Sequence, residues 1–241
     1  LIILKIINII IIYAGACLTS MVKLLIDGFK NFRKEYFSEK SGFFQKLVQR
    51  GQAPKIMVVC CSDSRVDPAI LFGLRPGELF VVRNVANLVP PYSPDDQLHG
   101  VSAALEFGVR DLSVSDIIVL GHAFCGGISA LCKRVKSEND GVNSIDSKNG
   151  DRDFINNWVD IAKPALKKVN FDDWPGQSQH EAERKAILNS VKNLKTFPWI
   201  KSAIVEKKLR VHGWWFDMEN GALWGNKESS DEFEKLASGA L

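Results

Sequence analysis

Four short apolar runs recur along the chain, separated by more polar segments. They cover residues 55–60, 79–82, 116–120 and 209–216, and the last alternates in part between apolar and polar positions. Short continuous apolar runs are typical of strands that are buried on both faces of a sheet. The pattern therefore predicts four β-strands in the interior of the protein.

Helical spacing of apolar residues occurs between and before these runs. The clearest helical segments are residues 97–109 and 127–136, and two more, residues 24–37 and 42–50, precede the first strand. Alternation of strands and helices predicts a parallel sheet with right-handed crossovers. We therefore expect an α/β fold with a central, mostly parallel four-stranded β-sheet, flanking helices and an N-terminal helical arm.

The second half of the chain adds three predicted features. Residues 137–153 are rich in Gly, Asn, Asp and Ser, which predicts a surface loop. Ser178–Glu181 matches the Ser-x-x-Glu capping box, which predicts a helix from there to about Thr196. Glu219–Gly221 predicts a hairpin turn that leads from the fourth strand into an extra C-terminal strand at residues 222–224.

The first 20 residues have a different character. Residues 1–12 are almost wholly apolar, but they are too few to span a bilayer as a helix, and no clear signal-peptide cleavage site follows them. An ordinary soluble pattern begins at Met21. We expect residues 1–20 to be a non-native or disordered leader, with a signal, an anchor or a helical arm as alternatives, and residues 21–241 to form a single domain.

Composition and charge narrow the class of protein. The 241 residues are 46% hydrophobic and 24% charged, with a formal net charge of +3 and no long basic run. We therefore expect a globular enzyme that binds neither nucleic acid nor a membrane. The odd count of five cysteines does not suggest a disulfide framework. Metal binding or simple burial of the thiols fits better and favours the reducing cytoplasm.

Three potential metal ligands fall at the predicted carboxyl ends of strands, where open α/β sheets bind their ligands. Cys61 directly follows the first strand, His122 follows the third, and Cys125 lies three residues further on. Two cysteines and one histidine are good zinc ligands, and three protein ligands leave a fourth position for water. Because a buried free cysteine is often only a small hydrophobic residue, zinc binding and simple burial remain equal alternatives from the residues alone.

Asp63 and Arg65 follow the first of these cysteines. Alternate residues of an extended segment share one side, so Arg65 can form a bidentate pair with Asp63 and hold it off a metal ion. Asp63 can then accept the proton of a metal-bound water. If the pair broke, Asp63 could itself take the fourth ligand position, which predicts a switch built from one carboxylate.

The other cysteines and histidines are not expected to bind the metal, and His212, in the fourth predicted strand, is given no role. Cys60 points to the opposite strand face from Cys61 and is expected in the core. His99 is expected to be a structural hydrogen-bonding residue, and His180 is expected to be exposed in a first helical turn.

Several dense motifs follow one another in order along residues 24–225. They are Gly51–Pro54, Cys61–Val66, Pro76–Asn87, His99–Gly100 and Gly121–Gly127, with a weaker match at Val211–Asp217. In order and spacing these motifs resemble the β-class carbonic anhydrases (carbonate dehydratases). The resemblance implies a zinc lyase that reversibly hydrates carbon dioxide to bicarbonate and a proton through zinc-bound hydroxide.

The resemblance also implies roles for individual residues. One zinc ion per subunit would be held by Cys61, His122 and Cys125, and Asp63 with Arg65 would orient the zinc hydroxide. An apolar wall suits carbon dioxide, because this substrate has no net dipole. The implied substrate contacts are Gln52, Phe80, Val85, Phe107 and Gly126.

A subtype and an oligomeric state follow from the same resemblance. Some family members bind bicarbonate at a regulatory site that includes a tryptophan three residues before the first zinc cysteine, and here that position is Val58. The plant-type, non-allosteric subtype is therefore implied. Family members are dimers or larger, so a homodimer or homotetramer is expected, with the helix at residues 24–37 packing across the interface or, alternatively, within its own subunit.

Two other functions remain open from the sequence. The same fold can hydrolyse carbon disulfide or carbonyl sulfide, because only the access route to the pocket need differ. The other alternative is a catalytically silent zinc protein, although such a protein would need none of Asp63, Arg65 and Gln52.

Overall fold

The computed structural model describes residues 21–140, 152–167, 169–227 and 230–238. The predicted leader and most of the predicted loop at residues 137–153 lie outside the described residues. The chain forms two compact units, Leu1–Gln52 and Ala53–Leu241. The single domain expected over residues 21–241 stays a prediction.

Helices make up most of the described part of the first unit. A helix covers residues 21–33 and continues as the π-helical segment η1 (Lys34–Glu39), and α2 covers Phe43–Arg50. The ring of Phe32 lies 5.4 Å from that of Phe44, so aromatic packing joins the two segments. Both helices predicted before the first strand are confirmed.

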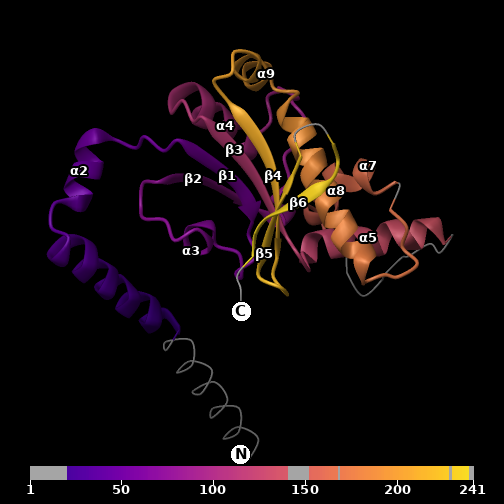
Figure 1. Cartoon of the computed structure of the whole chain (residues 1–241), viewed down its shortest axis with the longest axis horizontal. Helices are drawn as coiled ribbons and strands as arrows, with labels where there is room; N and C mark the ends of the chain where they lie inside the picture. The colour runs from indigo at the N-terminus through magenta and orange to yellow at the C-terminus, as the bar shows by residue number, and fades with distance from the viewer. Residues whose placement is uncertain (1–20, 141–151, 168, 228–229, 239–241) are drawn as a thin grey trace, which may run out of the picture. The chain divides into compact units, whose positions relative to one another are not determined.

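A six-stranded sheet forms the centre of the second unit (Figure 1), in the order β2-β1-β3-β4-β5-β6. The first four strands are parallel, β5 pairs antiparallel with β4, and β6 pairs antiparallel with β5. The predicted parallel sheet and its C-terminal hairpin are confirmed. The strands are β1 (Ile56–Cys61), β2 (Leu79–Asn84), β3 (Asp116–His122), β4 (Arg210–Asp217), β5 (Ala222–Asn226) and β6 (Phe233–Ser238).

β6 is absent from the sequence prediction. Phe233 and Leu236 are its only large apolar residues, and it lies at the edge of the sheet, where most of its side chains are exposed. An exposed edge strand lacks the continuous apolar pattern by which the central strands are recognised.

Helices surround the sheet, and the segments predicted at residues 97–109, 127–136 and 178–196 are confirmed. α5 runs three residues into the predicted surface loop, and six short helices (α3, η2, α6, η4, α7 and α9) were not predicted. Within the described residues, every helix is too short or too polar to cross a bilayer. The helices are η2 (Val85–Asn87), α3 (Pro68–Leu71), α4 (Gly100–Glu106), η3 (Phe107–Asp111), α5 (Gly126–Asn139), α6 (Ile155–Val159), η4 (Asp160–Ala162), α7 (Lys163–Leu166), α8 (Gln177–Leu194) and α9 (Pro198–Val205).

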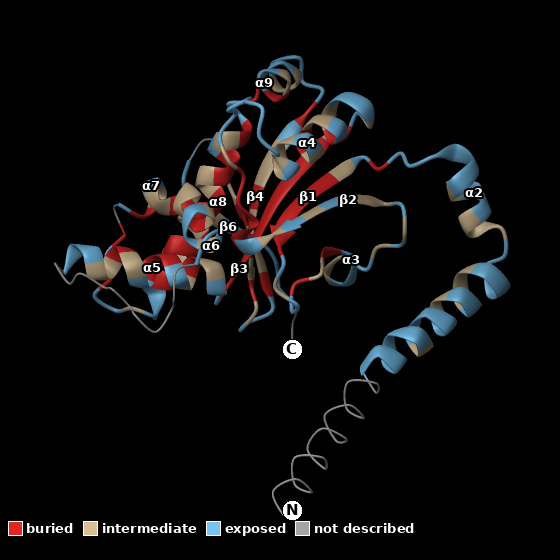
Figure 2. Ribbon diagram, turned by 180° about the vertical axis from the view of Figure 1, so that it is seen from behind, coloured by how far each residue is buried: buried red, intermediate tan, exposed pale blue. Residues whose placement is uncertain are grey.

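Alternate residues of the central strands face two different cores. Met57 of β1 packs in a cluster that includes Ile187 of α8, whereas Cys60 packs in another cluster with Leu120 of β3. Figure 2 shows that buried residues run along β1 and β3. The predicted core position of Cys60, on the opposite face from Cys61, is confirmed.

The start of α8 differs from the prediction. The helix begins at Gln177, so Ser178 lies inside its first turn. The Asp173 carboxylate accepts hydrogen bonds from the backbone N–H groups of Gln177 (2.9 Å) and Ser178 (3.0 Å). The predicted capping box is therefore wrong, because a carboxylate from the preceding turn caps the helix in place of the Ser178 side chain.

α8 approaches the sheet closely at Gly121 in β3. A Cβ atom at this position would lie 2.6 Å from Ile187 Cδ1 of α8. Side-chain atoms do not pack at such a distance, so the absence of a side chain at Gly121 permits this contact between helix and sheet.

Gly121→Ala is expected to lower the free energy of unfolding by about 1–3 kcal/mol, because the added methyl group overpacks the contact with Ile187. Chemical denaturation measures the difference. Gly100→Ala is the matched control, since a Cβ atom at Gly100 meets no atom within 4 Å. Equal losses in the two variants would contradict the close-contact explanation.

At the start of β3, the Asp116 carboxylate is held by three side chains. Arg210 donates to it from Nε (2.8 Å) and Nη2 (2.9 Å), His212 Nε2 lies 2.9 Å from Oδ1, and Ser115 Oγ donates to Oδ2 (2.8 Å). Burial opposes ionisation of this carboxyl, but the hydrogen bonds outweigh burial and lower its pKa to about 2.

Asp116→Asn is expected to lower the free energy of unfolding by about 1–2 kcal/mol at neutral pH, because an amide is a weaker acceptor for the Arg210 guanidinium. A carboxyl with a depressed folded-state pKa stabilises the fold above its unfolded pKa of about 3.9, and this stabilisation is lost as the pH falls toward the folded value. Urea denaturation should therefore show a constant difference down to about pH 5 and a shrinking one below about pH 4. A difference that does not shrink in strong acid would refute this account.

Candidate metal centre

β1 and β3 are adjacent parallel strands, so their carboxyl ends meet at one edge of the sheet. Cys61 ends β1, His122 ends β3, and Cys125 directly precedes α5. Their ligand atoms all lie within 4.8 Å of one another, and the two Sγ atoms are 3.9 Å apart. All three residues are buried. The fold therefore brings the three predicted ligands together.

His122 presents a nitrogen that has no hydrogen-bond partner. Its Nδ1 lies 2.8 Å from the carbonyl oxygen of Ala123, so Nδ1 carries a proton and donates it there. Nε2 is buried and has no hydrogen-bond partner among the described residues. Buried polar atoms are usually satisfied, and a metal-binding histidine usually donates its other ring N–H to a carbonyl or carboxylate. The orphaned Nε2 therefore marks a ligand position.

The cluster attracts positive charge. The sulfur atoms of Cys61 and Cys125 share a hydrogen bond, and this bond is the main reason that the pKa of Cys61 falls to about 4 despite its burial. The same hydrogen bond, together with burial, raises the pKa of Cys125. Burial opposes protonation of His122, but the Cys61 thiolate and the Ala123 carbonyl outweigh it and raise the pKa of His122. Protons or a metal cation can supply the charge that this site favours.

Two thiolates and an imidazole fit zinc. Soft sulfur ligands together with imidazole suit zinc, whereas magnesium and calcium prefer oxygen ligands. Three protein ligands leave one tetrahedral position free, which is typical of catalytic rather than structural zinc. In the part of the chain that the structure describes, these three residues form the only cluster of this kind.

A carboxylate held by an arginine lies beside the cluster. Asp63 Oδ2 is 3.9 Å from His122 Nε2. Arg65 donates from Nε to Oδ1 (2.9 Å) and from Nη2 to Oδ2 (2.7 Å), and its backbone N–H also donates to Oδ1 (3.0 Å). The predicted bidentate pair is confirmed, but the extended segment expected to form it is wrong: Asp63–Val66 is a turn, in which the Val66 N–H donates to the Asp63 carbonyl oxygen (3.2 Å). These hydrogen bonds hold the pKa of Asp63 well below its usual range, so Asp63 is ionised.

Arg83 of β2 fixes the segment that carries this carboxylate. It donates from Nε to the carbonyl oxygen of Cys61 (3.1 Å) and from Nη2 to that of Asp63 (2.7 Å). Its Nη1 donates to the Asp67 carboxylate (2.9 Å), which also accepts from the backbone N–H of Ala69 at the start of α3. One guanidinium therefore ties together β1, the Asp63 segment and α3.

Comparisons with known proteins identify the family. The carbonic anhydrase family model matches residues 56–223. A carbonic anhydrase from Synechocystis sp. is 36% identical over 202 residues, which cover 83% of this chain and 69% of the relative. The solved structure of the β-carbonic anhydrase CcaA matches with a TM-score of 0.77 and 32% identity, over 91% of this chain and 93% of that chain. The chain belongs to the β-class carbonic anhydrases.

A fungal structure extends the comparison. One of two tetrameric β-carbonic anhydrases from the filamentous ascomycete Sordaria macrospora matches with a TM-score of 0.67 and 26% identity, over 92% of this chain and 100% of that chain. The fold and the family predicted from the sequence motifs are thus confirmed.

Two predicted substrate contacts of this carbonic anhydrase lie next to the cluster. Val85 directly precedes Ala86, and the backbone N–H of Ala86 donates to the Cys61 sulfur (3.4 Å). Gly126 directly follows Cys125. Val85 also borders an open, mostly apolar hollow with Trp158, whose indole N–H donates to the Val85 carbonyl oxygen (2.7 Å). An apolar surface therefore adjoins the candidate metal ligands.

The other predicted substrate contacts are not brought to the cluster within the described unit. Phe80 and Phe107 lie together, with ring centroids 5.9 Å apart. Cys61 pairs with Asn84 of β2, and Phe80 lies four positions before Asn84. Four positions are about 13 Å along a strand, so Phe80 lies well away from the ligands. Gln52 ends the first unit. The roles of Phe80, Phe107 and Gln52 stay predictions.

Behind Cys125 lies a buried carboxylate that the sequence analysis missed. Glu183 of α8 accepts a hydrogen bond from the backbone N–H of Cys125 (3.0 Å). Its neighbour His180 has a side chain only 13% exposed, so the expected exposure of His180 is wrong: α8 turns this residue toward the site. The sequence did offer a signal for Glu183. This charged residue lies on the same helix face as the apolar Ala182 and Ile187, which indicates a buried carboxylate.

Replacement of a candidate ligand is expected to abolish tight zinc binding. His122→Ala removes the orphaned Nε2, and Cys125→Ser replaces a thiolate with a poor zinc ligand. Each variant should lose more than about 100-fold in zinc affinity. Replacing a residue that only hydrogen-bonds to a metal ligand costs up to about 100-fold, and loss of a ligand itself should cost more. Competition with a chromophoric chelator measures the loss. His99→Ala is the control, because His99 pairs with Asp95 on the surface; a His122→Ala protein that keeps one tightly bound zinc would contradict the assignment.

Proposed function

We propose that this carbonic anhydrase is a zinc enzyme that reversibly hydrates carbon dioxide to bicarbonate and a proton. The observation that carries the proposal is an ionised, arginine-held Asp63 beside the Cys61, His122 and Cys125 cluster. A structural zinc site would have four protein ligands and no need of this pair. Similarity to proteins named as carbonic anhydrases supports the same reaction.

Two sulfurs and Nε2 of His122 would hold the zinc ion. Zinc bound there supplies Lewis acidity, which lowers the pKa of a coordinated water to about 7 and so provides a nucleophile near neutral pH. The Ala123 carbonyl fixes the Nδ1–H tautomer of His122, so Nε2 keeps the lone pair that ligation requires.

Asp63 would orient the attacking water. Its low pKa makes it a weak base, so it would act as a hydrogen-bond acceptor for the water and would not take up the proton, in contrast to the role expected from the sequence. Arg65 engages Oδ1 with two donors and Oδ2 with one, which leaves Oδ2 with acceptor capacity 3.9 Å from Nε2 of His122. Release of Asp63 from Arg65 would let the carboxylate compete for the fourth ligand position.

The substrate pocket would combine apolar side chains with one polar contact. Val85 borders the ligands, while Phe80 lies too far along β2 to reach the cluster of its own chain. Phe80 and Phe107 could line such a site only across an interface with another copy. β2 is an edge strand, where a second chain can pack. Gln52 would supply the hydrogen bond to the substrate.

A homodimer or homotetramer fits these features. The similar Sordaria macrospora structure is described as tetrameric. The helix at residues 21–33 exposes large apolar side chains, among them Leu24, Leu25 and Phe29, each more than half exposed. Burial of this face against another copy would remove apolar surface from water.

The proposed subtype and location rest on the cysteines and their surroundings. The four cysteines in the described residues are free thiols, which supports a reducing, cytoplasmic compartment. Val58, at the position where allosteric members carry tryptophan, is fully buried in β1. The non-allosteric subtype therefore remains our proposal.

Asp63→Ala is expected to retain zinc but to lose about 100-fold in kcat/KM for carbon dioxide hydration, because the carboxylate orients water and does not hold the metal. Stopped-flow hydration with a pH indicator measures the rate. Ser64→Ala, an exposed neighbour in the same segment, should keep the full rate. Full activity in Asp63→Ala would contradict the orienting role of Asp63 but not the proposed reaction.

Zinc-loaded protein of unchanged sequence tests the reaction itself. It should hydrate carbon dioxide far faster than it hydrolyses carbonyl sulfide or carbon disulfide in parallel assays. The reverse order would favour a hydrolase on the same fold, and inactivity toward all three would favour a catalytically silent zinc protein.

A further inference from the structure

The peptide group between Phe124 and Cys125 is held from both sides. Its carbonyl oxygen accepts from Arg65 Nη2 (3.3 Å), and its N–H donates to Glu183 Oε1 (3.0 Å). Phe124 has a φ of 55°, a left-handed conformation that is uncommon for a residue with a side chain. Such conformations persist where the surrounding structure determines them. The two hydrogen bonds therefore help to hold the corner that leads from His122 to Cys125.

Glu183 lies in a site built from four donors. Oε1 accepts from the Cys125 N–H and from Gln179 Nε2 (3.1 Å), and Oε2 accepts from His180 Nδ1 (3.1 Å) and Trp215 Nε1 (3.2 Å). A carboxylate offers about four lone-pair sites, so all of them are used. The residue is only 2% exposed, and a charge is buried at low cost only when it is paired and hydrogen-bonded. Its orientation is therefore fixed, with one of its four bonds on the backbone of a candidate metal ligand.

We propose that Glu183 is a positioning residue of the metal centre. It fixes the peptide between Phe124 and Cys125, so that the Cys125 sulfur faces the other two ligands while the Phe124 carbonyl faces Arg65. Through this one peptide group, Glu183 links the ligand loop to the arginine that holds Asp63. Glu183 does so without touching metal, water or substrate. The inference rests on the proposed zinc site but not on the reaction.

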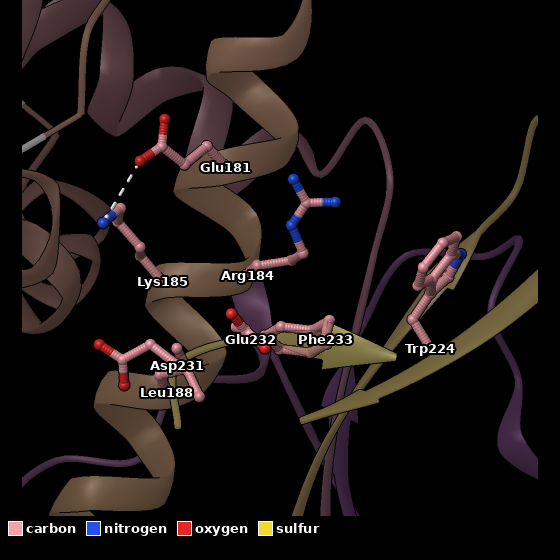
Figure 3. Close-up of a pocket in the computed structure, with 8 residues that line it drawn as sticks. All are labelled: Glu181, Arg184, Lys185, Leu188, Trp224, Asp231, Glu232 and Phe233. Carbon is pink, nitrogen blue, oxygen red and sulfur yellow. Dashed lines mark ion pairs between the residues drawn. The ribbon is translucent and has the colours of Figure 1, made fainter. Parts of the chain in front are cut away.

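A neighbouring carboxylate on α8 provides the control. Figure 3 shows Glu181 paired with Lys185 in a surface pocket whose lining mixes acidic, basic and apolar side chains from α8, from β5 and from the start of β6 with the two residues before it. The pocket includes none of the candidate ligands. Glu181 therefore matches Glu183 in charge and helix, but its side chain is 42% exposed and makes no hydrogen bond to the ligand loop among the described residues.

Zinc affinity of the full-length protein tests the proposal. Glu183→Ala is expected to weaken zinc binding by about 10- to 100-fold, because Cys125 loses the acceptor that fixes its backbone. Glu183→Gln keeps one acceptor oxygen but places an amide N–H₂ against other donors, so it should lose several-fold and less than the alanine variant. Glu181→Ala should bind zinc with the same affinity as the unsubstituted protein. Chelator competition measures affinity, and circular dichroism gives the folded fraction and melting temperature.

Cobalt(II) in place of zinc gives a second readout. Thiolate-to-cobalt charge-transfer absorption reports how the sulfurs meet the metal, and Glu183→Ala should change this band in fully loaded, folded protein, whereas Glu181→Ala should not. A role in folding alone would lower the melting temperature but leave both the affinity and the band unchanged, and that result would overturn the proposal.

The remaining outcomes separate this inference from the proposed function. Absence of tight zinc binding in the unsubstituted protein would overturn the metal centre, and the role of Glu183 with it. Normal binding there and in both Glu183 variants would overturn only the role of Glu183. Should Glu183→Ala fail to fold, Glu183→Gln carries the test, since an affinity and a cobalt band identical to those of the unsubstituted protein would contradict positioning.

Discussion

The parallel pairing of β1 with β3 is the constraint on which the metal centre depends. Val59 pairs with Val119 and Cys60 with Leu120, so Cys61 and His122 leave the sheet at the same edge. Side chains alternate between the two faces of a strand, and a slip of one residue would bring Cys60 to the site in place of Cys61. The buried apolar residues of both strands fix the register, and the register selects the cysteine that can meet His122 and Cys125.

Charge balance is the second constraint at this edge of the sheet. Cys61, Asp63 and Glu183 bring negative charge into or beside a buried cluster, and Arg65 and Arg83 offset part of it from the Asp63 side. The remaining negative charge lies around the orphaned nitrogen of His122. Burial makes such a concentration of like charge unfavourable unless a cation joins it. The same contacts that hold the ligands in place therefore also favour a divalent metal.

Local patterns in the sequence predict much of this arrangement, and contacts between distant segments account for what they miss. Cys61, Asp63 and Arg65 lie within five residues of one another, so a short motif carries them, although a turn and not an extended strand brings Arg65 to Asp63. The contact between Glu183 and Cys125 joins residues 58 apart, and no short motif encodes it. β6 is missed for another reason, because an edge strand exposes side chains that a central strand would bury. Sequence motifs thus locate the candidate ligands, whereas tertiary structure is needed to find what holds them.

The two sides of the cluster differ in their access to solvent, and this difference separates their roles. Asp63 and Arg65 have side chains that are 17% and 55% exposed, whereas the side chains of His122 and Glu183 are almost fully buried. The cluster is therefore more open to solvent on the Asp63 side than on the Glu183 side. On the Glu183 side, burial of the carboxylate shields its hydrogen bonds from bulk solvent, so they can fix the Cys125 backbone. The exposed Asp63 can therefore change its hydrogen bonds with the solvent, while the buried Glu183 keeps the loop from His122 to Cys125 in place.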